Sequence, residues 1–375
     1  MTARSYPSLI REAKADLGPV CLVVGGAGFL GQALTGALLE RGHRVRVLDR
    51  TPLPAGGRAE QHLADIRDLG AVREATSGVS TVFHTAAVIN LLGVYDRATR
   101  AEVFGINCDG TRNVIRACVD AGVPRLVYTS TNSVCFDPDP VVNGDESKPY
   151  ATRFIDLYAE SKVEAERDVL AADGVRGLRT VALRPAGLWG PGPGCYMLQK
   201  FVEELARGSL VATIGDGRAV SDNTHVANLV HAELLAAEKL VETPDAVGGR
   251  AYFITDEEQL NLMEWFRPLL EGLGYSMPRW SIPARLMYGI AYLMEWAHRL
   301  GGPRPKMTRL EVHNLTSSFT FRTDRARREL GYAPLIQREE GQRICLPYYR
   351  EVLNAALAQG GRGASARKAR GATQP

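Results

Sequence analysis

Val24–Gly31, which reads VGGAGFLG, joins a short apolar run at Val20–Val24 to the helical pattern of Phe29–Glu40. The order of strand, glycine-rich turn and helix matters more than the glycines alone. A phosphate can approach the backbone only where side chains are absent, and the first turn of the helix then offers unpaired N–H groups and the positive end of its dipole. The stretch fits both G-x-G-x-x-G and G-x-x-G-x-x-G, and in this context it predicts a dinucleotide-binding turn.

Short apolar runs alternate with amphipathic stretches through the first half of the chain. This alternation predicts repeated β-α units, and therefore a Rossmann-type α/β fold: a doubly wound parallel sheet of six or seven strands with helices on both faces. We expect strands at Val20–Val24, Arg44–Leu48, Thr81–His84, Arg125–Thr129, Thr180–Leu183 and Tyr252–Ile254, and helices at Phe29–Glu40, Glu102–Ala121 and Tyr158–Ala171.

The pattern loosens after Pro185, where the sequence becomes rich in Gly and Pro at Trp189–Gly194. We therefore expect a smaller carboxy-terminal substrate lobe grown onto the sheet. The predicted organisation is an N-terminal extension at 1–17, a dinucleotide-binding domain at 18–190, a mainly substrate-binding lobe at 191–358 whose late elements return to the main domain, and a disordered basic tail at 359–375.

Composition excludes several classes of protein. The six cysteines are far apart and form no C-x-x-C pair, which predicts a reducing compartment, the cytoplasm, and no metal site. Charged residues interrupt Met1–Pro19, so a secretory signal is not expected. The net charge is +3, but Gly360–Pro375 contributes +4 and leaves −1 on the rest, so the folded body has no electrostatic footprint for nucleic acid.

Asp49 ends the second predicted strand at the spacing where a carboxylate accepts both ribose hydroxyls of an adenosine. Its charge would repel the 2′-phosphate of NADP, so we expect NAD over NADP, although Arg50 would weaken that preference. Asp65 and Ile66 are placed to touch the adenine edge. The residues expected to contact the cofactor are Gly25, Gly28, Phe29, Leu30, Gly31, Asp49, Arg50, Asp65, Ile66, Thr85, Ala86, Ala87, Lys162 and Pro185.

Tyr158 and Lys162 lie four residues apart, so on a helix they share one face. Tyrosine titrates near pH 10, and a neighbouring ammonium with a bound oxidised nicotinamide would favour the phenolate, a usable base. Upstream, Tyr128–Val134 places hydroxyl groups at the carboxyl end of a parallel strand, where one could hydrogen-bond a substrate oxygen. Asn107, within a helix, is expected to serve a buried hydrogen-bond relay, and His84 to be structural.

Together these motifs resemble the extended short-chain dehydrogenase/reductase family over roughly residues 18–355. More narrowly, the chain is similar to bacterial 3β-hydroxysteroid dehydrogenases and sterol-4α-carboxylate 3-dehydrogenases. The narrower resemblance rests on Tyr128–Val134, Phe154–Tyr158, Arg184–Gly190, Asp222–Val226, Tyr252–Asp256 and Leu330–Tyr332.

The resemblance implies that Tyr158 is the acid/base, Lys162 its partner and Asn107 a member of the proton relay. It implies that Thr131 supplies the hydroxyl that is usually a serine, with Ser130 as a substitute. Val24 stands where the family commonly has threonine, which weakens a local hydrogen bond and leaves the phosphate cradle intact.

The expected reaction is oxidation of the 3β-hydroxyl of a sterol or steroid to the 3-ketone. Decarboxylation follows if the substrate carries a 4-carboxylate, and Δ5-Δ4 isomerisation follows if it carries a 5,6 double bond. Alternatives are a 2-alkyl-3-oxoalkanoate reductase, a sugar-nucleotide enzyme that would use Arg218, and a non-catalytic dinucleotide-binding regulator.

The partner suggested by the sequence is an apolar, sterol-like small molecule. Ile282–Trp296 is strongly apolar but short, and it contains Arg285 and Glu295, so it is not expected to span a membrane. Our first interpretation is a helix packed on the substrate lobe, and a membrane-touching helix is the second. A homodimer is one assembly that the sequence allows.

Overall fold

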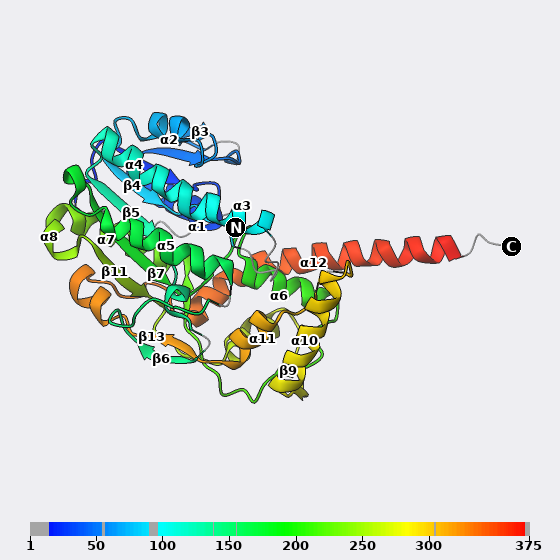
Figure 1. The fold of residues 1–375 in the computed structure, drawn as a ribbon. Coiled ribbons are helices and arrows are strands. Elements are labelled where there is room, and N and C mark those ends of the chain that lie inside the picture. Colours follow the sequence, from blue (N-terminus) through cyan, green and yellow to red (C-terminus); the bar gives the residue numbers. More distant parts are fainter. Residues whose placement is uncertain are drawn as a thin grey trace.

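One parallel sheet of seven strands runs through the main body of the protein (Figure 1). The structure, a computed structural model, describes residues 15–371 apart from 55–56, 90–96, 138, 155 and 304, with side chains described as far as 358. The strand order is β11-β7-β5-β4-β1-β2-β3, with every neighbouring pair parallel, which confirms the predicted fold. The strands are β1 Val20–Val24, β2 Arg44–Asp49, β3 Glu60–Leu63, β4 Thr81–His84, β5 Arg125–Thr129, β7 Arg179–Pro185 and β11 Arg250–Ile254.

The strand order reverses beside β1, which pairs with β2 on one side and β4 on the other. At the carboxyl end of β1, Val24 lies beside Leu48 of β2 and His84 of β4. Connections diverge at such a reversal, and open α/β sheets bind their ligands outside the carboxyl ends of the strands at this point. The end of β1 is therefore where the fold places a cofactor.

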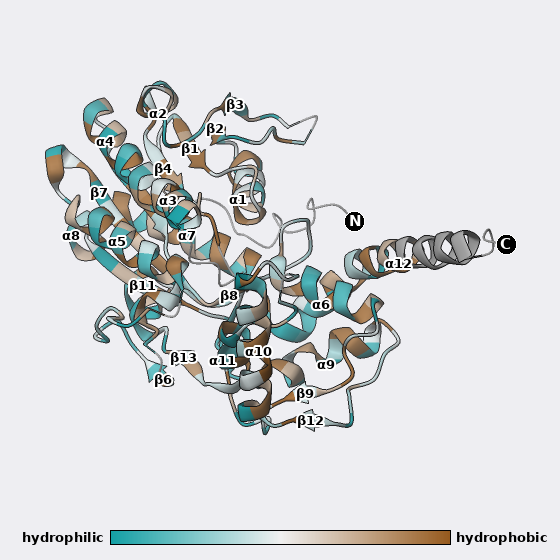
Figure 2. Cartoon of the chain, turned by 45° about the vertical axis from the view of Figure 1, so that its right-hand side comes forward, coloured by the Kyte–Doolittle hydropathy of each residue, from teal (hydrophilic) through white to brown (hydrophobic). Residues whose placement is uncertain are grey.

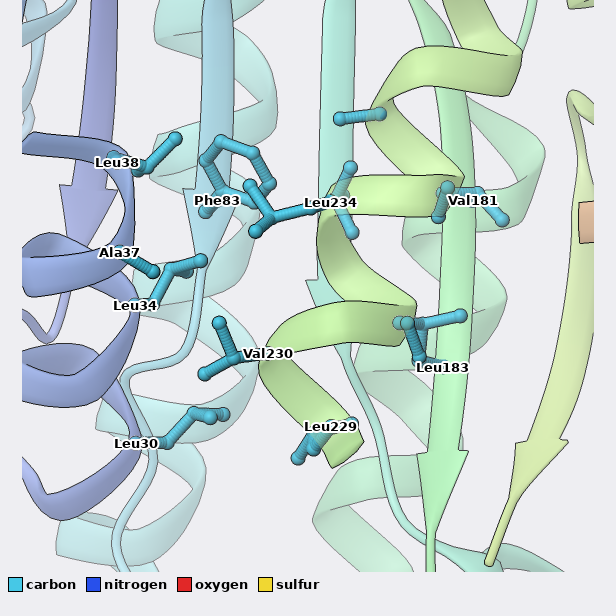
Figure 3. Close-up of a cluster of buried hydrophobic side chains, with 14 of the residues drawn as sticks. Leu30, Leu34, Ala37, Leu38, Phe83, Val181, Leu183, Leu229, Val230 and Leu234 are labelled. Atoms are coloured by element: carbon cyan, nitrogen blue, oxygen red, sulfur yellow. The ribbon is translucent and has the colours of Figure 1, made fainter. Parts of the chain in front are cut away.

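Helices cover both faces of the sheet. Apolar side chains of two helices, α1 and α7, meet over one face, where Leu34 and Leu234 pack above Phe83 and Val181 (Figure 3). A second buried cluster joins α2, α4 and α5 to the opposite face. The helices around the sheet are α1 Phe29–Glu40, α2 Leu69–Thr76, α3 Arg97–Phe104, α4 Thr111–Ala121, α5 Leu157–Ala171, α7 Val226–Glu242 and α8 Pro244–Val247, with short turns η4 Asn132–Cys135 and η5 Val175–Gly177.

The helix predicted at Glu102–Ala121 is present, begins earlier, at Arg97, and changes its hydrogen-bonding pattern partway along. A π-helical segment, η3 Gly105–Gly110, separates α3 from α4. Gly110 packs so closely on the loop after β3 that an added Cβ would lie 2.4 Å from Cδ1 of Ile66. Single π turns inside helices often mark functional sites, and this one carries Asn107.

The remaining elements form a smaller lobe and its links to the sheet. Two short parallel pairings belong to it, β8 with β10 and β9 with β12, while β13 returns to pair with β6 from the first half of the chain. Buried aromatic and aliphatic side chains of α6, α9 and α12 form its core. The elements are β6 Val141–Gly144, β8 Gly187–Trp189, β9 Thr213–Ile214, β10 Asn223–His225, β12 Ser281–Ile282, β13 Phe319–Phe321, α6 Tyr196–Ala206, α9 Leu262–Gly272, α10 Ala284–Arg299, α11 Arg309–Thr316, η6 Ala326–Leu330 and α12 Arg338–Gly371.

The domain boundaries stay predictions. The extension at 1–17 lies largely outside the described residues, although Leu17 is buried in the core. At the other end the backbone of α12 continues as a helix to Gly371, where we expected a disordered tail from 359 (Figure 1). A helix that is already nucleated extends at little cost per residue, which composition alone does not reveal. Within the described part, no helix is long and apolar enough to cross a membrane.

Candidate active site

The glycine-rich turn is fixed by close backbone contacts. Gly25 adopts a φ of +87° and donates its N–H to the Leu48 carbonyl at 2.8 Å. A Cβ on Gly25 would lie 2.6 Å from the Cα of Ala86, and one on Gly31 would lie 2.1 Å from the Gly25 carbonyl oxygen. Only glycine fits at either position, because α1 and the segment after β4 both pack directly on the turn.

The first turn of α1 is open to a ligand. Gly28 is the N-cap, and no side chain in the described part of the protein caps the helix there. Among the described residues, a Cβ on Gly28 would meet only the Gly25 carbonyl oxygen, at 3.3 Å, which leaves the outer side of the turn free of them. Phe29 and Leu30 begin the helix. The N–H groups of this turn and the positive helix end fit the pyrophosphate of a dinucleotide.

Asp49, the last residue of β2, faces the same turn. Its Oδ2 accepts the Ala27 N–H at 3.0 Å and its Oδ1 accepts the Thr51 N–H at 2.8 Å. Each carboxylate oxygen keeps a further lone pair for a ligand hydroxyl. Arg50 beside it is exposed. The position therefore suits the ribose contact predicted from the sequence.

The loop after β3 is engaged internally. The Asp65 carboxylate pairs with Arg67 at 2.6 Å, and hydrogen bonds from Arg67 hold the pKa of Asp65 below its usual value. Ile66 is buried, and its carbonyl accepts a hydrogen bond from Asn113 of α4 at 3.0 Å. Asn113 was not anticipated, because nothing in the local sequence distinguishes it from a solvent-facing amide.

Asn107 anchors the segment that follows β4. Its Oδ1 accepts the Val88 N–H at 2.8 Å, while its Nδ2 donates to the Val88 carbonyl at 3.0 Å and to Oγ of Ser161 at 2.9 Å. Ser161 in turn donates to the Tyr158 carbonyl at 2.8 Å. The Asn107 side chain therefore ties the segment Thr85–Val88 beside the glycine turn to α5.

His84 is structural in its setting. It is fully buried, and one ring nitrogen lies 2.9 Å from the hydroxyl of Thr111. Burial, aided by the charge of Lys162, lowers the pKa of His84 to about 3. The ring is therefore neutral at physiological pH.

Lys162 is buried beside the carboxyl end of β5. Its Nζ donates to the Thr129 carbonyl at 2.6 Å and lies 4.1 Å from the centroid of the Tyr128 ring. Burial lowers the pKa of Lys162 to about 7, and the charge of Glu166 opposes this shift. The carbonyl and the ring face compensate for part of the lost hydration of the ammonium.

Tyr158 lies one turn earlier on α5, whose N-cap Asp156 accepts the Ala159 N–H at 2.7 Å. Burial and the charge of Asp156 raise the pKa of Tyr158, and a hydrogen bond with Thr131 lowers it. Without a ligand the phenol is therefore protonated. Its use as a base requires further positive charge nearby.

The two hydroxyls predicted to serve the substrate have different surroundings. Thr131 is the one beside Tyr158, and it also accepts the Ser133 N–H at 3.2 Å. Ser130 instead donates to the buried carboxylate of Glu166. The end of β5 therefore contacts both motif residues of α5, Tyr158 through Thr131 and Lys162 through Thr129, while Ser130 points into the interior.

Two further predicted positions can be located. Pro185 ends β7, is buried, and pairs with Ile254 of β11. Arg218 is the residue that a sugar-nucleotide enzyme, one of the alternative functions, would use. Its side chain is 89% exposed, and the Asp216 carboxylate lies 3.8 Å from it.

A family model and several known proteins match most of this chain. The model of the 3-beta hydroxysteroid dehydrogenase/isomerase family matches residues 22–284. A "3-beta-hydroxysteroid dehydrogenase" of Mycolicibacterium neoaurum is 41% identical over 94% of this chain and 97% of the relative. A "3 beta-hydroxysteroid dehydrogenase/Delta 5-->4-isomerase" of Mycobacterium tuberculosis is 43% identical over 89% and 91%. A "3beta-hydroxysteroid-dehydrogenase/decarboxylase isoform 1" of Arabidopsis thaliana is 36% identical over 86% and 77%.

Solved structures give the same fold. The structure named gox2253 has a TM-score of 0.70 and 27% identity, covering 89% of this chain and 98% of that one. MoeE5, solved with UDP-glucuronic acid and NAD, has a TM-score of 0.67 and 26% identity, covering 89% and 99%. The fold is thus one in which other proteins hold a nicotinamide dinucleotide.

The buried ammonium predicts a pH-dependent stability. Lys162 loses its proton near pH 7 when folded but near its ordinary value of 10.5 when unfolded, so between these values the unfolded chain holds the extra proton and stability rises with pH. Replacing Lys162 by Met removes this dependence. We expect Lys162→Met to exceed the wild type in unfolding free energy at pH 6, by an amount that shrinks toward pH 10, in urea titrations of the cofactor-free protein. A constant difference across this range would contradict the assignment.

Proposed function

Because the chain belongs to the 3-beta hydroxysteroid dehydrogenase/isomerase family, we propose that it oxidises the 3β-hydroxyl of a sterol or steroid to the 3-ketone, using NAD. The observation that carries the proposal is that the end of β5 contacts both motif residues of α5, Tyr158 through Thr131 and Lys162 through Thr129, at the same sheet edge as the uncapped start of α1. Relatives that cover almost the whole chain act on this substrate class by name.

In the proposed mechanism the Tyr158 oxygen takes the proton of the substrate hydroxyl. The Thr131 hydroxyl, hydrogen-bonded to Tyr158, steadies the charge that develops on the substrate oxygen. The Lys162 ammonium favours the phenolate and holds the nicotinamide ribose, while Asn107 keeps α5 and the segment at Val88 in register. When bound, NAD would supply the acceptor for the hydride that leaves the carbinol carbon.

The choice of NAD is part of the proposal. Asp49 presents a carboxylate toward the glycine turn, and its charge opposes a 2′-phosphate. Arg50 is exposed and would be the residue that softens this preference.

A cytoplasmic location is proposed from the thiols. All six cysteines are free and buried. Burial raises the pKa of Cys21, Cys108 and Cys118 to about 12, so these thiols stay protonated and inert. Such a set suits a reducing compartment.

We also propose that the outer face of α10 rests on an anionic lipid surface. Our first interpretation, a packed helix, holds for one side only: α10 lies against α11 (Figure 2). On that helix Ala291 is the buried residue. The other side exposes large apolar residues. These are Leu286, Tyr288, Tyr292, Leu293 and Trp296, each 46–62% exposed, flanked by Trp280 at 79% and Leu300 at 68%.

Charge around this face is one-sided. The stretch 273–310 contains six basic residues and one acidic residue, Glu295, which pairs with Arg309 at 2.8 Å. Arg279, Arg285 and Arg299 are exposed. Tryptophan and tyrosine favour the membrane–water interface, and basic residues are attracted to anionic headgroups. A sterol-like substrate would itself partition into such a membrane.

The proposed chemistry predicts the effect of removing one oxygen. Tyr158→Phe should lower kcat for a 3β-hydroxysteroid by about 100-fold or more, because the proton acceptor is lost, while NADH binding persists. The control is Tyr348→Phe on α12, with unchanged turnover. Both are measured by NADH absorbance, with steroid products identified by mass spectrometry for a 4-carboxysterol and for a Δ5-steroid. Unchanged turnover in Tyr158→Phe would exclude the mechanism.

The cofactor preference has its own test. We expect higher wild-type kcat/KM with NAD than with NADP, and a smaller ratio in Asp49→Asn, which keeps the size of the side chain and removes the repelling charge. Rates at equal cofactor concentrations decide the point. Faster wild-type turnover with NADP would overturn the proposal.

Vesicle sedimentation tests the lipid contact. The wild type should bind vesicles of phosphatidylglycerol and phosphatidylcholine, more weakly as salt increases. Leu293→Asp and Trp296→Asp should each weaken binding by about tenfold or more, since burying one such side chain contributes about 1.5–3 kcal/mol and about 1.4 kcal/mol is tenfold. Val175→Asp, exposed on another part of the surface, is the control.

Equal binding by all four proteins would contradict the lipid contact. A wild-type dimer that dissociates in both α10 variants, seen by sedimentation velocity, would assign the face to a second copy of the chain instead.

A further inference from the structure

Three consecutive residues at the end of β5 each hold a different partner. The Thr129 carbonyl accepts the Lys162 ammonium at 2.6 Å. The next residue, Ser130, donates its hydroxyl to Glu166. Thr131 then meets Tyr158. The residues that contact Lys162 and Tyr158, Thr129 and Thr131, therefore lie on either side of Ser130, which contacts neither Lys162 nor Tyr158.

Glu166 is a buried junction. It is 0% exposed and lies one turn after Lys162 on α5. Besides Ser130, its carboxylate accepts the Tyr150 hydroxyl at 2.8 Å and the Arg184 guanidinium at 2.6 Å. Arg184 belongs to β7, next to β5 in the sheet. One carboxylate thus ties the end of β5 to α5 and to β7.

We propose that Glu166, acting through Ser130, is a positioning residue that holds 129–131 so that Thr129 and Thr131 meet Lys162 and Tyr158 in the reactive arrangement. The inference rests on the proposed function. The Glu166–Arg184 ion pair and the Tyr150 bond would satisfy the carboxylate without Ser130, so the Ser130 bond adds the tether to the strand end. Reacting groups displaced by about 1 Å can lose about 100-fold in rate, so such a tether matters.

The charge of Glu166 gives it a second effect on the same site, because it favours the protonated form of Lys162. Two other groups near Lys162 carry no charge at neutral pH: burial lowers the pKa of His84 to about 3 and raises that of Cys108 to about 12. The Tyr158 phenol, its pKa raised by burial, is also neutral.

Two more groups complete the surroundings of the ammonium. The Tyr128 ring contributes its face. From α7, Glu233 accepts the Thr129 hydroxyl at 2.5 Å, and burial raises the pKa of Glu233 to about 7, so it is only partly ionised. Arg184 is neutralised by Glu166 itself.

Ser130→Ala and Tyr150→Phe form a matched pair, since each removes one hydroxyl donor to Glu166 and leaves the ion pair with Arg184. We expect both to lose a similar unfolding free energy in urea. Only Ser130→Ala should lower kcat, by about tenfold or more, with the steroid KM within about twofold of wild type. Tyr150→Phe should keep kcat within about twofold. Equal kcat in the two variants would overturn the proposal.

Glu166→Gln tests the charge. Lys162 would lose its proton at lower pH, the phenolate of Tyr158 would be less favoured, and the acid limb of the kcat profile should move to higher pH. Ser130→Ala keeps the carboxylate and should leave this limb in place. A Glu166→Gln profile that coincides with that of the wild type would remove the electrostatic part of the proposal. If Glu166→Gln does not fold, the Ser130 and Tyr150 pair still decides the positioning part.

A wild type inactive on every 3β-hydroxysteroid would refute the proposed function and not the tether. In that case NADH affinity, followed by quenching of tryptophan fluorescence, separates the variants without substrate. Because Lys162 is proposed to hold the nicotinamide ribose, Ser130→Ala should bind NADH at least about threefold more weakly than Tyr150→Phe. Equal affinities would refute the tether.

Discussion

A buried ammonium is the constraint on which the rest of the site depends. A lysine inside a protein loses its hydration shell, and it stays charged only where oxygen atoms and negative charge replace that shell. Lys162 finds the Thr129 carbonyl, the face of Tyr128 and the nearby charge of Glu166. The first two depend on where β5 ends relative to α5, and Glu166 lies one turn after Lys162 on α5 itself. The chemistry of the site is therefore set by the meeting of one strand end with one helix.

The sheet topology brings the cofactor region to the same edge. In a parallel sheet all carboxyl ends lie together, so the glycine turn after β1, the segment after β4 and the end of β5 are neighbours although they are far apart in sequence. Asn107 then ties the β4 segment to α5 through Val88 and Ser161. The π turn at Gly105–Gly110 carries this amide. The helix thus departs from regular α-helical geometry at the segment that contains Asn107.

Much of this arrangement was predictable because strong local patterns set it. β1, α1, β4 and β5 begin and end at the residues expected from apolar periodicity and turn chemistry. The π turn at Gly105–Gly110 was missed, because apolar periodicity does not distinguish a π turn from a regular α-helix.

The partners of individual side chains were not predictable either. Ser130 and Thr131 are adjacent residues that both carry a hydroxyl. Side chains alternate along extended backbone, so only one of the two faces Glu166 and the other faces Tyr158, and the sequence does not say which. The ion pair between Asp65 and Arg67 was likewise not predicted. In the same way, the hydrophobicity of α10 was evident in the sequence, but its exposure depends on which side α11 covers.

Substrate selection must come from outside this edge. MoeE5 shares the fold and was solved with a UDP-sugar, so the strand order and the dinucleotide turn do not distinguish a sugar nucleotide from a sterol. In this chain Arg218 points to solvent, where it cannot neutralise an enclosed diphosphate, while α10 presents aromatic and aliphatic side chains. The α10 face of the lobe thus presents apolar side chains with exposed arginines around them. The proposed sterol chemistry therefore depends on two separable parts of the protein. The carboxyl edge of the sheet transfers the proton, and the smaller lobe receives the apolar substrate from the membrane.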